Sequence, residues 1–171
     1  TSDIDPTLGL GSSAAVTIAM LAALSGEATP QVHQDALSII RAQQGRGSGA
    51  DLAASLMGGA LSYRIEGKGP ARMAPLPPPP HMSLFNVGYK TPTAEVRARV
   101  AKAREDAPAK IDALYEEMGS VAEDTIQAAI HEGWNATGPH LVSYQGLMQR
   151  LGVSDDALDG AVARATATQG V

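Results

Sequence analysis

The residues of this chain that are best suited to chemistry gather in two glycine-rich turns. The first turn has two glycines and two serines, in the order Gly9-Leu10-Gly11-Ser12-Ser13-Ala14. Glycines let backbone N–H groups turn toward a ligand, and the start of a helix adds unpaired N–H groups and the positive end of the helix dipole. This pattern favours an anion cradle for a nucleotide triphosphate, although it lacks the Lys-Ser/Thr pair of a Walker A loop. From these residues alone, a serine-capped buried helix after a glycine turn is an equally good interpretation.

The second turn begins at Gly45 and ends on a single acid, Asp51, set among small and apolar residues. A carboxylate at this place could accept a proton from a substrate hydroxyl, or it could orient that hydroxyl by a hydrogen bond. Asp51 could also cap a short helix that begins at Leu52, since aspartate is common at helix N-caps. The two roles are compatible, and both stay open here.

Helices must hold these two turns. An unbroken apolar run predicts a helix over residues 13–24, and Thr29 followed by Pro30 predicts the start of a second helix that ends near Gln43. His33 on this second helix has no further ligand at metal spacing, so it is interpreted as a surface or packed histidine. Residues 3–7 are expected to be the end of a strand that leads into the first turn.

The rest of the chain predicts two strands and a series of helices. Alternation predicts strands over residues 60–64 and 83–89, on either side of a stiff connector that contains four consecutive prolines. A helix is expected to begin at Thr91 and Pro92, in the same way as at Thr29. From Asp106 onward, apolar residues at a spacing of three or four predict helices, mildly interrupted at Gly119 and separated by breaks at residues 133–135 and 152–155.

The composition bounds the kind of protein. The chain has 171 residues, of which 44% are apolar, and it has no cysteine and a formal net charge of −5. Scattered Lys and Arg in an acidic chain argue against a nucleic-acid partner, and no apolar run is long enough for a membrane span. Without cysteines or a leader, we expect a cytoplasmic protein that holds a small-molecule substrate by local donors. A homodimer is one open alternative for its assembly, which the sequence does not decide.

Taken in this order, the two turns strongly resemble those of the GHMP kinases, the family of galactokinase, homoserine kinase, mevalonate kinase and phosphomevalonate kinase. The first turn is similar to that family's phosphate-binding loop. The second matches the segment that carries the catalytic aspartate of the mevalonate-pathway members. The resemblance implies that Gly9, Leu10, Gly11, Ser12, Ser13 and Ala14 bind ATP, that Ser13 assists Mg²⁺, and that Asp51 is catalytic.

The resemblance also implies the fold class, which is α+β. Residues 1–75 are expected to form the N-terminal, ribosomal-S5-like domain, residues 76–82 a proline linker, and residues 83–171 a ferredoxin-like, helix-rich C-terminal domain. A family member normally has a strand region before the phosphate loop and a glycine-rich strand and turn after the last helix. Both domains are therefore expected to be incomplete in this chain, as the middle of a longer kinase.

The function implied is an ATP-dependent small-molecule kinase of the mevalonate (isoprenoid) pathway. Mevalonate kinases usually carry a magnesium-binding glutamate eleven residues ahead of the catalytic aspartate, where this chain has Ile40. The second turn looks closer to phosphomevalonate kinases, so we expect the acceptor to be 5-phosphomevalonate. A phosphorylated acceptor needs cations and helix-start N–H groups, and the candidates for binding it are Arg46, Ser48, Gly49, Lys90 and Thr91. Mevalonate as the acceptor is the alternative, and a non-catalytic nucleotide-binding module is an alternative from another class.

Overall fold

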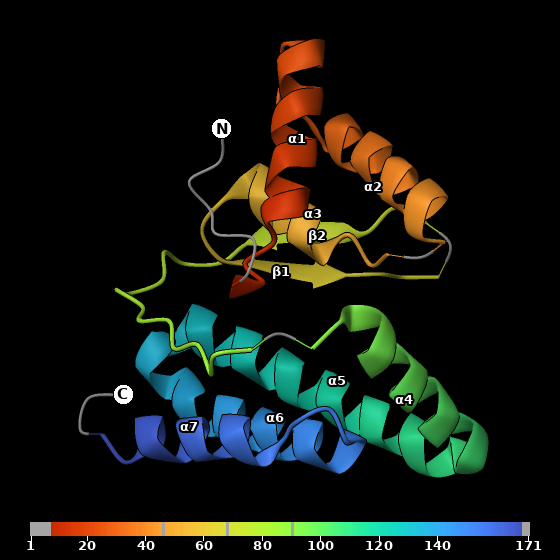
Figure 1. Ribbon diagram of the computed structural model, residues 1–171. Helices are drawn as coiled ribbons and strands as arrows, with labels where there is room; N and C mark the ends of the chain where they lie inside the picture. The colour runs from red at the N-terminus through yellow and green to blue at the C-terminus, as the bar shows by residue number, and fades with distance from the viewer. Residues whose placement is uncertain (1–7, 46, 68, 90, 169–171) are drawn as a thin grey trace. The chain divides into compact units, whose positions relative to one another are not determined.

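The computed structural model describes residues 8–45, 47–67, 69–89 and 91–168 (Figure 1). The chain divides into two compact units, Thr1–Pro79 and Pro80–Val171, so it passes from one unit to the other inside the proline run. The strand end expected at residues 3–7 lies outside the described residues.

Three helices and a β-hairpin build the first unit. In chain order they are α1 (Ser12–Ser25), α2 (Pro30–Gln44), α3 (Ala50–Met57), β1 (Leu61–Arg64) and β2 (Arg72–Pro75). The helix starts follow the local sequence, because Thr29 is extended at the N-cap of α2 and Pro30 occupies its first turn. The helices predicted over residues 13–24 and 30–43 are therefore confirmed to within one residue at each end.

The core of the first unit lies between its three helices. Side chains from all three are almost completely buried there: Ala14, Ile18, Val32, Ala36 and Leu52. Alanines in this cluster let the helix backbones approach closely, and α1 packs against both α2 and α3. The first turns of α1 and α3 are thereby brought close together.

The two strands pair in an antiparallel hairpin, with Leu61 opposite Pro75 and Arg64 opposite Arg72. The strand predicted over residues 60–64 is confirmed, but β2 was not predicted, because its residues lie in the stretch interpreted as a connector. A four-residue segment that ends in proline carries little strand signal of its own. Its conformation follows from the ladder that it forms with β1.

The second unit consists of helices. They are α4 (Thr93–Asp106), α5 (Pro108–His131), the 3₁₀ helix η2 (Trp134–Thr137), α6 (Gly138–Leu151) and α7 (Asp156–Thr166). α5 is continuous through Gly119, where the spacing of the apolar residues is mildly interrupted. Leu114 and Met118 of α5 pack against Leu147 of α6 to form the core of this unit. The breaks expected at residues 133–135 and 152–155 are confirmed.

Two predictions for the start of this unit are wrong. Residues 83–89 do not form a strand, and the side chains of Leu84 and Phe85 are each 76% exposed. A strand needs a neighbour for its backbone hydrogen bonds, and the described residues of this unit offer none. α4 begins at Thr93 rather than beside Thr91, with Pro92 as its N-cap. The described part of the second unit thus has no sheet, and its expected ferredoxin-like arrangement is not confirmed.

Hydrogen bonds to two aspartates join α7 to the residues around it. Asp155 is the N-cap of α7, where it accepts from the backbone N–H of Leu158 (3.0 Å) and from the Tyr89 hydroxyl. Asp159 accepts from the Ser154 hydroxyl (2.5 Å) and from the Gln145 amide (3.0 Å). Donors lower a carboxyl pKa because they stabilise its charged form. The Tyr89 hydroxyl holds the pKa of Asp155 below its usual range, and the Ser154 hydroxyl does the same for the pKa of Asp159.

We expect these two carboxylates to make the stability of the protein sensitive to acid. A carboxyl pKa that is lowered by folding contributes stability above its unfolded value of about 4, and this contribution is lost as the pH falls through the lowered folded value. The double variant D155N/D159N should be less stable than the wild type at neutral pH, and the difference should shrink below about pH 4. Urea midpoints measured between neutral and acid pH test this, with D124N, an exposed aspartate on α5, as the control. If the urea midpoints of the wild type and the double variant differed by the same amount at every pH, this prediction would be contradicted.

None of the described helices combines the length and the apolar character that a membrane crossing requires.

Candidate functional site

The first glycine turn leads directly into α1. Gly11 is the N-cap of this helix, with φ of +74°, and it has no side-chain capping bond. The interpretation as a serine-capped helix is wrong, since Ser12 and Ser13 both lie inside the helix. The backbone N–H groups of a first helical turn have no partner within the helix. Here no side chain caps the helix end, which suits these N–H groups to an anion.

A surface pocket of about 640 Å³ joins this turn to Asp51. Gly9, Leu10 and Gly11 line one side of it, and Asp51 lines it from α3. A β-carbon placed on Gly11 would lie 4.0 Å from the β-carbon of Asp51. The remaining lining is small or apolar apart from one hydroxyl: Ala15, Ile18, Ala19, Ala54 and Ser55. The structure therefore brings together the two turns that the sequence singled out.

Asp51 lies in the first turn of α3 but is not its cap. Gly49 is the N-cap, and the helix begins at Ala50, one residue before the aspartate. The expectation that Asp51 caps a helix beginning at Leu52 is therefore wrong, although the Leu52 N–H donates to Oδ1 of Asp51 (2.9 Å). An acidic residue in the first turn is favoured by the helix dipole. The Asp51 side chain is exposed, so a ligand in the pocket can reach it.

Three side chains from α2 and β1 contact the backbone of the second turn. Nε2 of His33 lies 3.0 Å from the Gly49 carbonyl oxygen. The Tyr63 hydroxyl donates to the Ser48 carbonyl (2.6 Å), and Nε of Arg41 donates to the Gly47 carbonyl (3.2 Å). His33 is 2% exposed, which confirms its interpretation as packed. The contacts of these three residues with the turn were not foreseen, because residues so distant in sequence give no local signal of them.

The other predicted site residues are distributed more widely. Ser13 is exposed, and Ala14 belongs to the buried core, so only its backbone can face a ligand. Ser48 is exposed and Gly49 is buried. Thr91 belongs to the second unit, and Arg46 and Lys90 lie outside the described residues. The binding roles of all these residues stay predictions.

The donors around the pocket fit a magnesium ion that arrives with a nucleotide. Within the described ranges, no three histidine or acidic side chains converge in a way that could hold a metal ion. Ile40, at the position where a magnesium-binding glutamate was considered, is half-buried and packs against the core of the first unit. Mg²⁺ commonly keeps several waters and binds through one or two protein oxygens and substrate phosphates. Ser13 is the predicted oxygen ligand; it is exposed in the first turn of α1 but is not among the residues that line the pocket.

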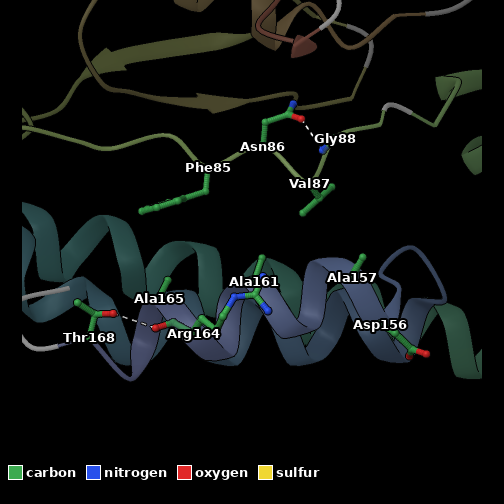
Figure 2. A pocket seen from close by; sticks show the side chains of 10 residues that line it. All are labelled: Phe85, Asn86, Val87, Gly88, Asp156, Ala157, Ala161, Arg164, Ala165 and Thr168. Atoms are coloured by element: carbon green, nitrogen blue, oxygen red, sulfur yellow. Dashed lines mark hydrogen bonds between the residues drawn. The ribbon is translucent and has the colours of Figure 1, made fainter.

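A second pocket, of about 670 Å³, lies in the second unit between residues 85–88 and α7 (Figure 2). Ala157, Ala161 and Ala165 form its helical wall, and Arg164 and Asp156 are its charged residues. None of the site residues predicted from the sequence is among the residues that line this pocket.

Comparison with known proteins finds a similarity in the first unit. The family model described as "GHMP kinases N terminal domain" matches residues 1–59, the segment with both glycine turns and Asp51. This segment is therefore similar to the N-terminal domain of GHMP kinases.

Nearly the whole chain is similar in sequence to part of several mevalonate kinases. The mevalonate kinase of Archaeoglobus fulgidus is 29% identical over 95% of this chain and 55% of its own length. Those of Thermococcus sibiricus (32% identical) and Pyrococcus furiosus (33% identical) are covered over 50% and 49% of their lengths. This chain thus spans about half the length of the curated relatives that it matches.

A solved structure shows the same fold. The crystal structure of L. major mevalonate kinase in complex with R-mevalonate superposes with a TM-score of 0.69 at 24% identity, over 90% of this chain and 49% of that one. The fold is therefore similar to that of this mevalonate kinase over about half of the latter's length, and it is rich in helix with a small sheet.

Proposed function

We propose that this chain carries the phosphate loop and the catalytic aspartate of an ATP-dependent small-molecule kinase. The observation that carries the proposal is the pocket lined by Gly9, Leu10 and Gly11 on one side and by Asp51 on the other. Its residues lie in the segment that matches the GHMP kinase N-terminal domain. Kinases of this family use ATP, and phosphoryl transfer requires a cradle for the triphosphate, magnesium, and a positioned acceptor oxygen.

The roles of the residues follow from their chemistry. The backbone N–H groups at the start of α1 would hold the phosphates, and the small side chains of Ala15 and Ala19 leave space beside them. Asp51 would orient the acceptor hydroxyl and accept its proton as the oxygen attacks the γ-phosphate. Bound Mg²⁺ would neutralise charge on the phosphates. Because the pocket is open at the surface, the phosphates and the acceptor can both reach it.

We propose mevalonate as the acceptor. The relatives that align with nearly the whole chain are mevalonate kinases, and this favours mevalonate over the 5-phosphomevalonate expected from the sequence. The comparisons give phosphomevalonate no support. Of the cations suggested for its phosphate, Arg46 and Lys90 lie outside the described residues. The hydrophobic setting of Ile40 also means that the protein would rely on fewer carboxylates for Mg²⁺ than its relatives' usual pattern.

A direct competition of acceptors tests this choice. The protein is supplied with ATP, Mg²⁺ and either mevalonate or 5-phosphomevalonate, and kcat/KM is measured for each. We expect a preference for mevalonate of at least about 10-fold, since the described residues that line the pocket include no cation to compensate the charge of a phosphate on the acceptor.

A preference for 5-phosphomevalonate would overturn the choice of acceptor and leave the kinase proposal intact. Turnover of neither acceptor would direct the search to other small alcohols phosphorylated by this family, such as sugars and homoserine. ATP binding without turnover of any of them would favour the non-catalytic nucleotide-binding module.

A further inference from the structure

The turn that precedes Asp51 is held from outside by other elements. Three of its carbonyl groups, those of Gly47, Ser48 and Gly49, each receive a hydrogen bond from a different side chain. Two of the donors, Arg41 and His33, are on α2, and the third is Tyr63 on β1. Side chains more than five residues away in sequence thus fix a segment that has no regular secondary structure of its own.

The two aromatic donors also support each other. The rings of His33 and Tyr63 meet edge to face, with their centres 5.9 Å apart. A carbonyl oxygen can only accept, so the contact with Gly49 requires the hydrogen of the His33 imidazole to be on Nε2. This histidine is almost fully buried, and its bond to Gly49 gives its polar nitrogen a partner inside the core.

Tyr63 is suited to remain a donor. Burial raises the pKa of Tyr63 above its usual range; the Arg41 charge acts against this, and the Asp51 charge adds to it. The phenol therefore keeps its proton, and its ability to donate, to a higher pH than a free tyrosine does. That its pKa responds to Asp51 also places the tyrosine within electrostatic reach of the carboxylate.

These contacts determine where Asp51 lies. The Gly49 carbonyl that accepts from His33 also accepts from the backbone N–H of Ala53 (2.9 Å), the first hydrogen bond of α3. The turn and the first helical turn therefore move together, and Asp51 lies between Gly49 and Ala53. On the opposite side of the pocket, a β-carbon added to Gly11 would lie 4.0 Å from the β-carbon of Asp51. A shift of the second turn would change the separation between the carboxylate and the phosphate loop.

We propose that His33 and Tyr63, assisted by Arg41, are positioning residues that hold Asp51 at its working distance from the phosphate loop. This inference rests on the proposed kinase function. It assigns a role in catalysis to two side chains that line neither the loop nor the pocket.

The test uses four variants and two measurements. Tyr63→Phe removes only the hydroxyl that donates to Ser48. His33→Leu removes the bond to Gly49, whereas in His33→Gln the side-chain amide can take the place of Nε2. The control is Tyr144→Phe, which removes the hydroxyl of a half-buried tyrosine in the second unit. The measurements are steady-state kinetics with ATP and acceptor, and hydrogen exchange of the Ala53 amide in the protein without substrate.

We expect Tyr63→Phe and His33→Leu to lower kcat by about 10- to 10²-fold, the scale of a misplacement of about 1 Å. The KM for ATP should stay within about twofold, because the phosphate loop is untouched. Exchange at Ala53 should accelerate in the same two variants, and His33→Gln should recover most of both losses. Tyr144→Phe should behave as the wild type.

Unchanged kcat in Tyr63→Phe and His33→Leu would overturn the proposal, whatever happens to their thermal stability. Equal losses in His33→Gln and His33→Leu would also overturn it, since the hydrogen bond would not be the cause. If the wild-type protein phosphorylates no acceptor, the proposed function fails. In that case, exchange at Ala53 still decides whether the side chains hold the turn.

Discussion

Replacing Asp51 by asparagine is expected to lower kcat by about 10²–10⁴-fold, the usual contribution of a positioned acid or base. Asparagine has the same size and can still donate or accept a hydrogen bond, but it cannot take a proton from the acceptor hydroxyl. ATP affinity should change little, because the phosphates are assigned to backbone groups on the other side of the pocket. Steady-state kinetics and calorimetric titration with ATP measure the two quantities separately.

The matched control for this variant is Asp156→Asn. Asp156 also lies in the first turn of a helix, α7 in the second unit. Both variants lose a favourable interaction with a helix dipole, worth roughly 0.3–1 kcal/mol. We therefore expect similar small decreases in Tm, with the loss of activity confined to Asp51→Asn. Near-normal turnover in that variant would remove Asp51 from the catalytic machinery.

Replacing Gly11 by valine is expected to abolish tight ATP binding while the protein still folds. Gly11 has a left-handed backbone conformation that a β-branched residue adopts only at a cost of roughly 1–2 kcal/mol. The new side chain would also project toward Asp51, into the space between the two turns. A decrease in ATP affinity of at least about 10-fold, which corresponds to about 1.4 kcal/mol, should follow, because the added side chain would occupy space between the two turns.

Gly26→Val separates this effect from backbone strain. Gly26 ends the same helix that Gly11 begins, its φ of +77° is nearly equal, and nothing lies within 4 Å of an added β-carbon. The two variants should lose similar stability, and only Gly11→Val should lose ATP. If Gly11→Val binds ATP as the wild type does, the first turn is only a helix start and the kinase proposal fails.

The helices of this protein could be predicted because their signals are local. Thr29 with Pro30, and Gly152 at the end of α6, mark boundaries that the structure reproduces. The strands were harder to predict, since a strand forms only where a neighbouring strand pairs with it. Arg72–Pro75 became a strand because β1 lies beside it, whereas residues 83–89, with a stronger pattern, have no strand beside them in the described part of their unit.

The site shows the same division between local and distant effects. The residue types in the two turns, with their order, were enough to single out Gly9, Gly11 and Asp51, which line one pocket. The two predicted helix caps were wrong: Gly49 rather than Asp51 caps α3, and Gly11 rather than a serine caps α1. The residue that caps a helix is set by the local backbone geometry, which the sequence pattern does not fix to the exact residue. The contacts of His33 and Tyr63 with the second turn could not be predicted, since they require three elements to be folded together.

Gly49 has a consequence for how proteins of this kind can diverge. A β-carbon at this position would meet the Tyr63 hydroxyl at 3.0 Å, and Nε2 of His33 and a Leu37 methyl group at 3.1 Å each, on a backbone with φ of +84°. A substitution of Gly49 would require simultaneous adjustments on α2 and β1, so we do not expect it to be tolerated as a single mutation. Its neighbour Ser48 is exposed and bonds to Tyr63 through its backbone carbonyl, which every residue type has. Evolution toward a different acceptor can therefore sample side chains at Ser48 while Gly49 stays fixed.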